Sequence, residues 1–372
     1  MKICIFGSFG NADIGDDAML TEHLDNIYRL GVDKADIDLI VYQPKYSSRY
    51  FKMPIEQCIN NFQQINPSDY AFLLVTGGGT INTRNPAGKS LERVHRVVSA
   101  FSKHGVPIFM SGQTVGPLGV YPEHDQMARD IVGAVDVLTI RDDTYSFKYL
   151  SQIGASVKRL EASFDDAINL PLGSLPDDVA KLFTDGKKTV GLNTTLYTTD
   201  TPAKRKTIRD LVELIVQAKY RVVLIPHHPS DYRAMGKICY DMPGFSNVPG
   251  DVADVVLINT ENWRAEQAKA LISKCNMCVG GRYHFVVFAT SANVPTVGMA
   301  GNEYSYIKQN GFARMYGNSD CILPTDKCSA GVVFEKLISI KDSPPHCANT
   351  KCRSLEFFNQ WYAGIASSAK QG

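Results

Sequence analysis

The amino-acid sequence predicts an α/β protein with two doubly wound domains that face a cleft. Short apolar runs alternate with amphipathic segments in the first half of the chain, which is typical of βα units in a parallel sheet. A segment rich in proline, glycine and charge interrupts this pattern at residues 170–188, and the alternation then restarts. Glycine and polar residues follow successive apolar runs, and such sheets bind ligands at the carboxyl ends of their strands.

The individual elements follow from periodicity. A short apolar run predicts a strand, and apolar residues spaced by three and four predict a helix. The run at residues 70–75 is almost continuous, so we expect its strand to be buried on both faces. The expected strands are residues 3–6, 37–42, 70–75, 107–111, 137–140, 189–193, 222–226, 277–279 and 294–299. The expected helices are residues 16–30, 91–104, 124–132, 145–153, 203–219, 262–274, 282–291 and 354–369.

Length, composition and charge narrow the class of protein. The 372 residues suggest two domains of ordinary size, which we place at residues 1–173 and 187–345, with a helical tail at 346–372. The formal net charge is +1 and no block of Lys and Arg stands out, so we expect no nucleic-acid partner. No apolar stretch approaches about 20 residues, and the first residues lack a signal-peptide pattern. We therefore expect a cytoplasmic protein without an integral membrane segment.

The nine cysteines fit a reducing compartment. Five lie in or beside apolar runs and are expected in the core: Cys4, Cys58, Cys239, Cys275 and Cys278. A late group matches no regular zinc spacing, so no metal site is expected there: Cys321, Cys328, Cys347 and Cys352, with His346 nearby.

The most informative motif is Gly280-Gly281-Arg282-Tyr283-His284, between two apolar runs. It predicts a strand, a tight turn and a helix start, where backbone N–H groups can bind an anion. Arg282 offers a rigid fork of donors for phosphate or carboxylate, and His284 can transfer a proton near neutral pH. The alternative is that Arg282 forms an ordinary salt bridge and His284 is a buried, hydrogen-bonded histidine.

A second glycine-containing loop follows the first predicted strand. It carries Asn11, Asp13, Gly15 and Asp16, and its acidity argues against a pyrophosphate lying on it. Such a loop suits sugar hydroxyls, although Asp16 can equally cap the helix that follows.

Further loops of this kind end the next three predicted strands. Gly78 and Gly79 belong to a triple glycine, Gln113 follows the next strand, and Arg141 follows the one after. Each has an ordinary interpretation as a turn, but together they form a coherent cleft wall.

In the second half, His227 and His228 follow a predicted strand and should point to opposite sides, so they are unlikely to bind a metal jointly. One of the two is expected to help hold an anion. The sequence contains no Walker loop, no His-Glu-x-x-His, no Gly-x-Ser-x-Gly and, after the first strand, no Gly-x-Gly-x-x-Gly.

In order along the chain, these motifs resemble those of the polysaccharide pyruvyl transferase family. Residues 14–18 resemble its Gly-Asp-Glu-Ala signature, 77–79 its triple glycine, 112–117 its Gln-x-x-Gly-Pro loop, 141–142 its Arg-Asp strand end, 282–284 its Arg-Leu-His, and 295–298 the stretch that follows. The chain departs from the family pattern at Asp13, where Asn is usual, at Tyr283, where Leu is usual, and at Gly280-Gly281, where a bulkier residue is common.

The resemblance implies a glycosyltransferase-B-like fold with two Rossmann-like domains. It implies transfer of pyruvate from phosphoenolpyruvate to a sugar diol, giving a pyruvate ketal on a cell-surface or capsular polysaccharide precursor. His284 carries over as the general acid and Arg282 as a donor-site residue, and we place Gly280, Gly281 and His227 beside them in the second domain. We place Asn11, Asp13, Gly15, Asp16, Gly78, Gly79, Gln113 and Arg141 on the acceptor side. Asp13 and Asp16 are the candidates for the base, and no metal or cofactor other than the co-substrate phosphoenolpyruvate is expected.

Two other functions stay open. One is a nucleotide-sugar glycosyltransferase of the same fold, for which Glu303 is the best candidate to bind a ribose. The other is a non-catalytic relative that binds a glycan or an anion. A lipid-linked sugar acceptor would bring the protein to the inner face of the membrane, and a homo-oligomer is compatible with the sequence.

Overall fold

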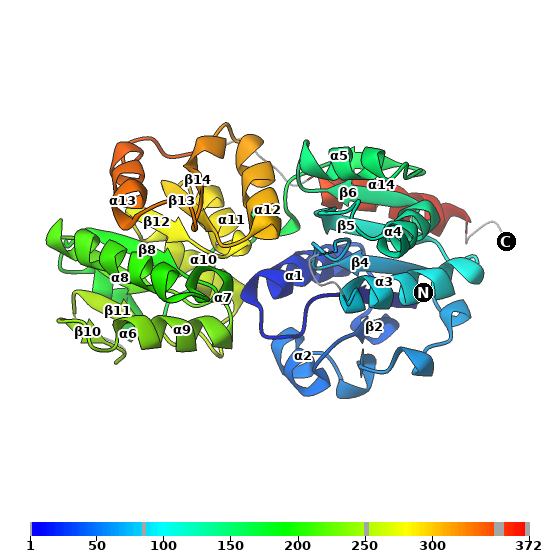
Figure 1. Ribbon diagram of the computed structural model, residues 1–372. Helices are drawn as coiled ribbons and strands as arrows, with labels where there is room; N and C mark the ends of the chain where they lie inside the picture. The colour runs from blue at the N-terminus through cyan, green and yellow to red at the C-terminus, as the bar shows by residue number, and fades with distance from the viewer. Residues whose placement is uncertain (1, 84–86, 249–252, 346–352, 369–372) are drawn as a thin grey trace. The chain divides into compact units, whose positions relative to one another are not determined.

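A computed structural model describes residues 2–83, 87–248, 253–345 and 353–368, and it confirms an α/β protein with two doubly wound, Rossmann-like units (Figure 1). Unit 1 comprises residues 1–11, 16–169 and 350–372, and unit 2 comprises residues 12–15 and 170–349. This division differs from the predicted ranges at three places, one of which is that unit 2 already begins at residue 170. Residues 12–15 group with unit 2, and the C-terminal tail completes unit 1 instead of standing alone.

Unit 1 is built on a parallel sheet of seven strands in the order β3-β2-β1-β4-β5-β6-β7. Its strands are β1 (Ile3–Gly7), β2 (Ile37–Ile40), β3 (Cys58–Ile59), β4 (Phe72–Thr76), β5 (Ile108–Gln113), β6 (Val137–Ile140) and β7 (Leu160–Ala162). Its helices are α1 (Ile14–Arg29), α2 (Pro44–Phe51), α3 (Lys89–Lys103), α4 (Pro122–Ala134), α5 (Tyr145–Gln152) and α14 (Ser354–Ser368). Every residue of β4 is buried, as the continuous apolar run predicts for a central parallel strand.

Unit 2 repeats the architecture with the strand order β10-β11-β9-β8-β12-β13-β14. Its strands are β8 (Thr189–Asn193), β9 (Arg221–Leu224), β10 (Phe245–Ser246), β11 (Val255–Leu257), β12 (Met277–Gly280), β13 (Thr296–Ala300) and β14 (Ile322–Pro324). Its helices are α6 (Asp177–Ala180), α7 (Leu196–Thr199), α8 (Pro202–Gln217), α9 (Pro229–Cys239), α10 (Ala265–Ser273), α11 (Tyr283–Ser291), α12 (Glu303–Arg314) and α13 (Ala330–Ser339).

The segment expected to link the two domains belongs to unit 2 from its first residues. Lys269 Nζ donates to the carbonyl of Leu170 at 2.6 Å, and the N–H of Gly173 donates to the carbonyl of Glu266 at 2.8 Å. Leu170 is buried, and α6 begins at Asp177. Although this segment is rich in proline and glycine, its first residues are therefore already packed on α10.

The tail helix α14 covers one face of the unit 1 sheet. Phe357 and Phe358 are buried, and the Phe358 ring lies 5.8 Å from that of Phe72 in β4 and 5.3 Å from that of Phe109 in β5. Burying one such side chain stabilises a fold by about 1.5–3 kcal/mol. This packing explains why the tail groups with unit 1.

All the predicted strands and helices are present with ends shifted by a few residues, but the periodicity analysis missed several elements. The missed strands, β3, β7, β10, β11 and β14, have two or three residues each, too few to display a period. The missed helices are α2, α6, α7, α9, α12 and α13.

Other expectations concern the cysteines, membrane helices and charge. The five cysteines predicted in the core are buried, and so is Cys321, whereas Cys347, Cys352 and His346 lie outside the described residues.

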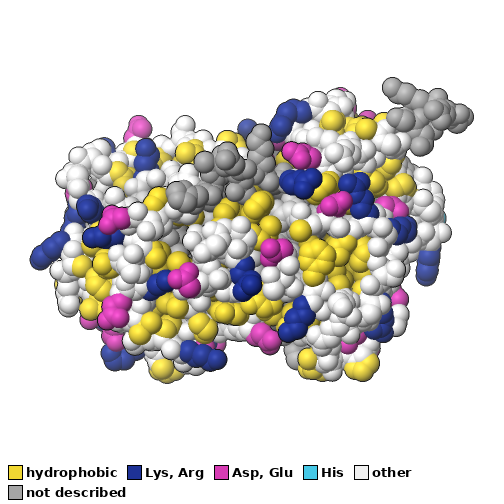
Figure 2. Space-filling view, turned by 90° about the horizontal axis from the view of Figure 1, so that it is seen from above, with side chains coloured by type: hydrophobic (Ala, Val, Ile, Leu, Met, Phe, Trp, Pro, Cys, Tyr) yellow, Lys and Arg dark blue, Asp and Glu magenta, His cyan; other side chains and the backbone are white. Residues whose placement is uncertain are grey.

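None of the helices in the described part of the chain combines the length and apolar character that crossing a membrane requires. On the face drawn in Figure 2, basic and acidic side chains are interspersed.

Candidate functional site

The candidate site lies at the carboxyl ends of three adjacent strands of unit 2. β8 ends at Asn193, β9 leads into His227, and β12 leads through Gly280 and Gly281 into Arg282. The strand order reverses direction between β8 and β12, because β9 extends the sheet on one side of β8 and β12 on the other. Ligands of doubly wound folds bind at this kind of switch point.

The Gly280-Gly281 turn is held by Asn193. The N–H of Gly281 donates to the Asn193 carbonyl at 2.9 Å, and the N–H of Arg282 donates to its side-chain oxygen at 3.0 Å. The expectation that this turn presents free N–H groups is therefore wrong for these two residues. Glycine at 280 has a packing reason, because a Cβ there would lie 2.6 Å from the ring of Phe285. α11 begins one residue after Arg282, so its first turn supplies the positive end of a helix dipole.

Arg282 is clamped between two carboxylates. Its Nε and Nη2 donate to the two oxygens of Asp231 at 2.7 and 2.9 Å, and its Nη1 donates to Oδ2 of Asp13 at 2.7 Å. The Asp231 side chain is fully buried, whereas 23% of the Arg282 side chain and 20% of the Asp13 side chain are exposed. Asp231 thus fixes the guanidinium in a bidentate pair, and Asp13 is the more accessible of its two partners.

The position of Asp231 follows from the start of α9. Pro229 opens the helix after the cap residue His228, which makes Asp231 the third helical residue, where acidic side chains favour the dipole. One of its oxygens also accepts the N–H of His227 at 3.2 Å. Asp231 and Asn193 are the residues of this site that the sequence analysis did not identify.

Asp13 is ionised in this arrangement. Burial by itself raises the pKa of its carboxyl, but the charge of Arg282, followed by those of three nearby histidines, more than offsets burial and leaves the pKa at about 2. Oδ1 of Asp13 also accepts the N–H of Gly15 at 3.1 Å. A carboxylate with so low a pKa is a weak base for as long as Arg282 holds it.

His284, the second residue of α11, is packed against the loop that carries Asp13. A Cβ on Gly15 would lie 2.0 Å from Nδ1 of His284, so only glycine allows the backbone to approach the ring this closely. Asp13, Gly15, Arg282 and His284 therefore lie in one place, although residues 15 and 282 are far apart in the sequence.

The two neighbouring histidines differ in environment. His227 is fully buried between the rings of Phe285 and Phe288, at 5.5 and 5.4 Å, and burial lowers its pKa to about 3, so it is neutral. Neither of its ring nitrogens has a hydrogen-bond partner within the described ranges. His228 accepts the N–H of Ser230 at Nδ1, and burial lowers its pKa too. Across the described residues, no group of His, Cys, Asp and Glu is arranged to hold a metal ion.

The other predicted site residues lie in unit 1. Arg141 is buried, donates to Asp165 at 2.6 Å and to the Thr114 hydroxyl at 2.9 Å, and lies under Gly78. Gln113 is buried and accepts from the Thr80 hydroxyl at 3.1 Å. The buried hydrogen bonds of Arg141 and Gln113 therefore stabilise the loops at these strand ends. Gly79 has a positive φ of 80°, Asn11 accepts from Gln43, and Asp16 lies in the first turn of α1.

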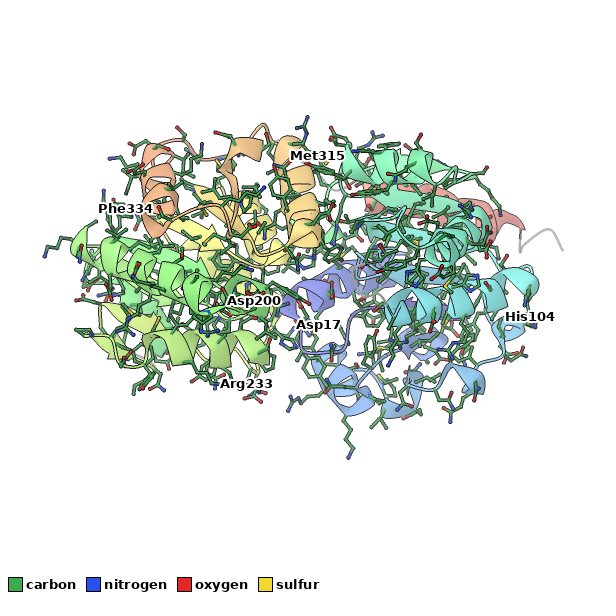
Figure 3. All side chains as sticks on the ribbon, viewed as in Figure 1. Asp17, His104, Asp200, Arg233, Met315 and Phe334 are labelled. Atoms are coloured by element: carbon green, nitrogen blue, oxygen red, sulfur yellow. The ribbon has the colours of Figure 1, made fainter. Side chains whose placement is uncertain are left out.

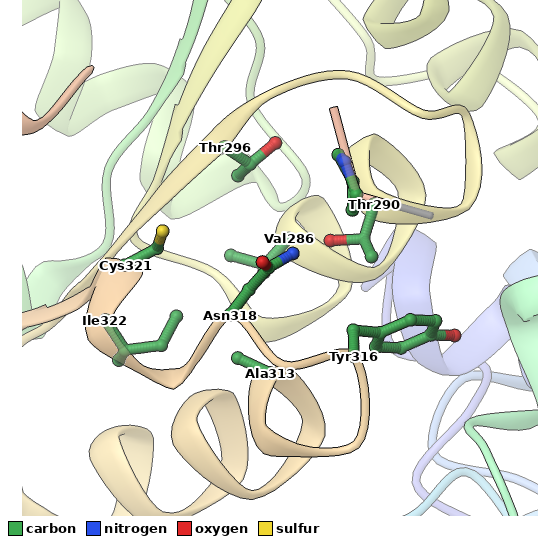
Figure 4. Close-up of a pocket in the computed structure, with 9 residues that line it drawn as sticks. Val286, Thr290, Thr296, Ala313, Tyr316, Asn318, Cys321 and Ile322 are labelled. Atoms are coloured by element: carbon green, nitrogen blue, oxygen red, sulfur yellow. The ribbon is translucent and has the colours of Figure 1, made fainter. Parts of the chain in front are cut away.

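An internal cavity of unit 2 is too small for a substrate (Figure 4). It lies beside α11 and β13, is lined by residues that include Thr290, Tyr316 and Cys321, and measures about 10 Å³. That volume is about enough for one water molecule.

Comparison with known structures defines the class of fold. The chain has a glycosyltransferase-B-like fold. It superposes on UDP-GlcNAc 2-epimerase from Methanocaldococcus jannaschii with a TM-score of 0.60 and 12% identity, covering 98% of this chain and 99% of that one. The epimerase from Neisseria meningitidis gives 0.60 and 11%, covering 98% and 100%. Trehalose 6-phosphate synthase from Burkholderia multivorans gives 0.50 and 11%, covering 100% and 99%.

The family follows from the sequence. The model of the polysaccharide pyruvyl transferase family matches residues 15–303, which is most of the chain. The protein belongs to this family, whose name denotes transferases that act on polysaccharide. No curated protein matches the chain.

Proposed function

We propose that this protein transfers pyruvate from phosphoenolpyruvate to a sugar diol, forming a pyruvate ketal on a precursor of a cell-surface polysaccharide. The observation that carries the proposal is the placement of Arg282 and His284 two residues apart, at the start of α11 and at the switch point of unit 2. At this place the guanidinium of Arg282 could bind a small anionic molecule and the imidazole of His284 could give it a proton. Membership of the chain in this family supports the same function.

Phosphoenolpyruvate has a carboxylate and a phosphate, and both suit a guanidinium and the N-terminus of a helix. In the proposed reaction, His284 as imidazolium protonates the methylene carbon, which makes C2 electrophilic. One sugar hydroxyl attacks C2 and releases its proton to the base, and the C2–O bond to phosphate breaks. The second hydroxyl then closes the ketal ring and releases its proton, which the departing phosphate takes up.

In this proposal, Asp13 competes with the donor for Arg282 and, once displaced, acts as the base. An anionic donor that binds Nη1 of Arg282 must displace the more accessible of its two carboxylate partners, which is Asp13. The buried pair with Asp231 stays in place and keeps the fork oriented. Once released from Arg282, the Asp13 carboxylate becomes a stronger base and can accept the proton of a sugar hydroxyl. The proposed acceptor or cleft roles of Asn11, Asp16, Gly78, Gly79, Gln113 and Arg141 rest on their places in loops at strand ends and, except for Asn11, on the motif resemblance.

Calorimetric titration with phosphoenolpyruvate, with uridine diphosphate as the comparison ligand, tests the proposal. Arg282→Lys keeps the charge beside Asp231 but removes the planar fork, so we expect it to weaken phosphoenolpyruvate binding at least about tenfold. Arg209→Lys, which alters an arginine of α8 paired with Asp241, is the matched control and should bind as the wild type does.

The other outcomes identify the rival functions. Binding of uridine diphosphate that is lost in Arg282→Lys, without binding of phosphoenolpyruvate, would contradict the proposal and favour a nucleotide-sugar glycosyltransferase. Phosphoenolpyruvate binding without phosphate release, when a panel of sugar acceptors is supplied, would favour a non-catalytic relative.

We expect the protein to act on a glycan or lipid-linked sugar without any metal or further cofactor.

A further inference from the structure

Unit 2 has a second basic feature, a surface hollow bordered by α7, α8 and α9. It has a volume of about 300 Å³ and is lined by Leu196, Thr199, Arg205, Ser230, Arg233, Ala234 and Lys237. Volumes of this order are typical of small-molecule sites, which start at about 300 Å³. None of the lining residues belongs to the cluster formed by Asp13, His227, Asp231, Arg282 and His284.

Three cations surround this hollow and no acidic side chain lines it. Arg205 comes from α8, and Arg233 and Lys237 lie one turn apart on α9. Arg205 donates to the carbonyl of Thr199 at 2.8 Å, which holds its guanidinium against the end of α7. Within the part of the chain that the structure describes, no acidic residue pairs with Arg233 or Lys237. Figure 3 marks Arg233 on α9 and also Asp200, whose ion pair is with Lys204 at 3.0 Å.

Two of these placements oppose the stability of the helices that carry them, although Lys237 itself lies in the last turn of α9, where positive charge favours the helix dipole. Arg205 lies near the N-terminus of α8, whose first turn contains no acidic residue, although the helix dipole disfavours positive charge there. Arg233 and Lys237 are like charges at positions i and i+4, which repel each other on a helix surface. Residues that oppose local stability in this way are expected where a bound ligand compensates.

We propose that this hollow is an anion site for the diphosphate group of a small organic diphosphate. Three positive charges match the charge of a diphosphate better than that of a single phosphate. Leu196, which is exposed, and Ala234 offer apolar surface for the organic part of the ligand. Ser230 adds a hydroxyl, whose Oγ lies 2.7 Å from Nδ1 of His228. The proposal is independent of pyruvyl transfer and of the site at Arg282.

Calorimetry at low salt with inorganic pyrophosphate, inorganic phosphate and uridine diphosphate tests this site. We expect pyrophosphate to bind more tightly than phosphate, and the double variant Arg233→Gln/Lys237→Gln to weaken it at least about tenfold. The control double variant Lys206→Gln/Arg209→Gln removes two charges of α8 that are paired with Asp210 and Asp241, and should leave the affinity unchanged.

Equal losses in the two double variants would overturn the proposal, because they would indicate general charge attraction. Failure of pyrophosphate to bind the wild type would overturn it too. Tighter binding of uridine diphosphate than of pyrophosphate would support an organic diphosphate and identify a nucleotide as its source; equal binding would leave the diphosphate as the recognised group and support the site.

Hydrogen exchange on the wild type gives a check that does not depend on a folded variant. Saturating pyrophosphate should slow amide exchange in residues 229–237 and leave exchange in α13 unchanged. Unchanged exchange in residues 229–237 would contradict the proposal.

Discussion

Each unit places an arginine and an acidic partner at the carboxyl ends of its strands, but the two pairs differ in exposure. In unit 1, the side chains of Arg141 and Asp165 are 1% and 0% exposed. In unit 2, the side chain of Arg282 is 23% exposed and its second partner, Asp13, is 20% exposed. The same residue types therefore form a buried ion pair in one unit and a partly exposed one in the other. Both arginines follow the end of a strand in the sequence, so the motifs do not distinguish them. The difference in their burial appears only in the structure.

The largest effect should come from breaking the buried pair. Arg141→Met leaves Asp165 buried without its cation, so we expect the free energy of unfolding to fall by about 3–5 kcal/mol. Denaturant unfolding followed by circular dichroism measures this. Asp13→Asn leaves Arg282 paired with Asp231 and should lower the free energy of unfolding by less than Arg141→Met does. Similar losses in the two variants would remove the distinction between the units.

Histidine substitution sharpens the comparison. His284→Gln should lower kcat for phosphate release from phosphoenolpyruvate at least about 10²-fold, the contribution expected of a general acid, and should preserve donor affinity. His23 of unit 1, whose Nε2 lies 3.0 Å from Asp166, is fully buried, so His23→Gln should lower stability instead. His95→Gln provides the control: the side chain of His95 is 31% exposed, its Nε2 lies 3.1 Å from Asp130, and we expect its substitution to change neither kcat nor stability appreciably. A His284 variant with unchanged kcat would exclude its role as the acid.

Acidification should lower the folding stability of unit 2 through His227. Burial lowers the pKa of His227 from 6.5 to about 3, so between these values the unfolded chain binds a proton that the folded one does not. Stability is therefore complete above pH 6.5 and is lost as pH falls toward 3, by about 2 kcal/mol between pH 6.5 and 5. His227→Leu should flatten this part of the profile. If wild type and variant lose stability in parallel, His227 is not the cause.

The smallest effect concerns donor affinity. Asp13→Asn removes the carboxylate that competes with the donor for Arg282, so phosphoenolpyruvate should bind about three- to tenfold more tightly, by about 1 kcal/mol. Turnover should fall, because the amide cannot act as a base. Asp200→Asn removes an exposed charge from the same unit and serves as the matched control. Weaker binding by the Asp13 variant would show that Asp13 assists the donor instead of competing with it.

Sequence patterns located most of the fold because buried strands such as residues 72–76 are continuous apolar runs. They missed α9, whose start was interpreted only as a strand end with two histidines. A helix-start signal was present there, with Pro229 first and Asp231 in the first turn. The pairing of Arg282 could not be predicted. Its partners lie 51 and 269 residues away, and side-chain type alone does not say which of several acids the fold brings near.

Gly280 and Gly281 illustrate the same limit. The sequence correctly marked a turn between a strand and a helix, but it could not reveal that Asn193 occupies two of the backbone N–H groups. Similarly, Arg141 was expected in a cleft wall because it follows a strand. Its burial depends on Asp165 and Thr114, which come from two other strand ends.

The packing of α14 on β4 and β5 has a consequence for synthesis on the ribosome. The strands of unit 1 are synthesised before unit 2, whereas the helix that covers Phe72 and Phe109 is synthesised after it. Unit 1 is thus completed only after unit 2, and until then the part of its apolar sheet face around Phe72 and Phe109 lacks this cover, although α1 and α2 already pack in the same core cluster. Chains that stop before residue 354 would keep that face exposed and be prone to aggregate.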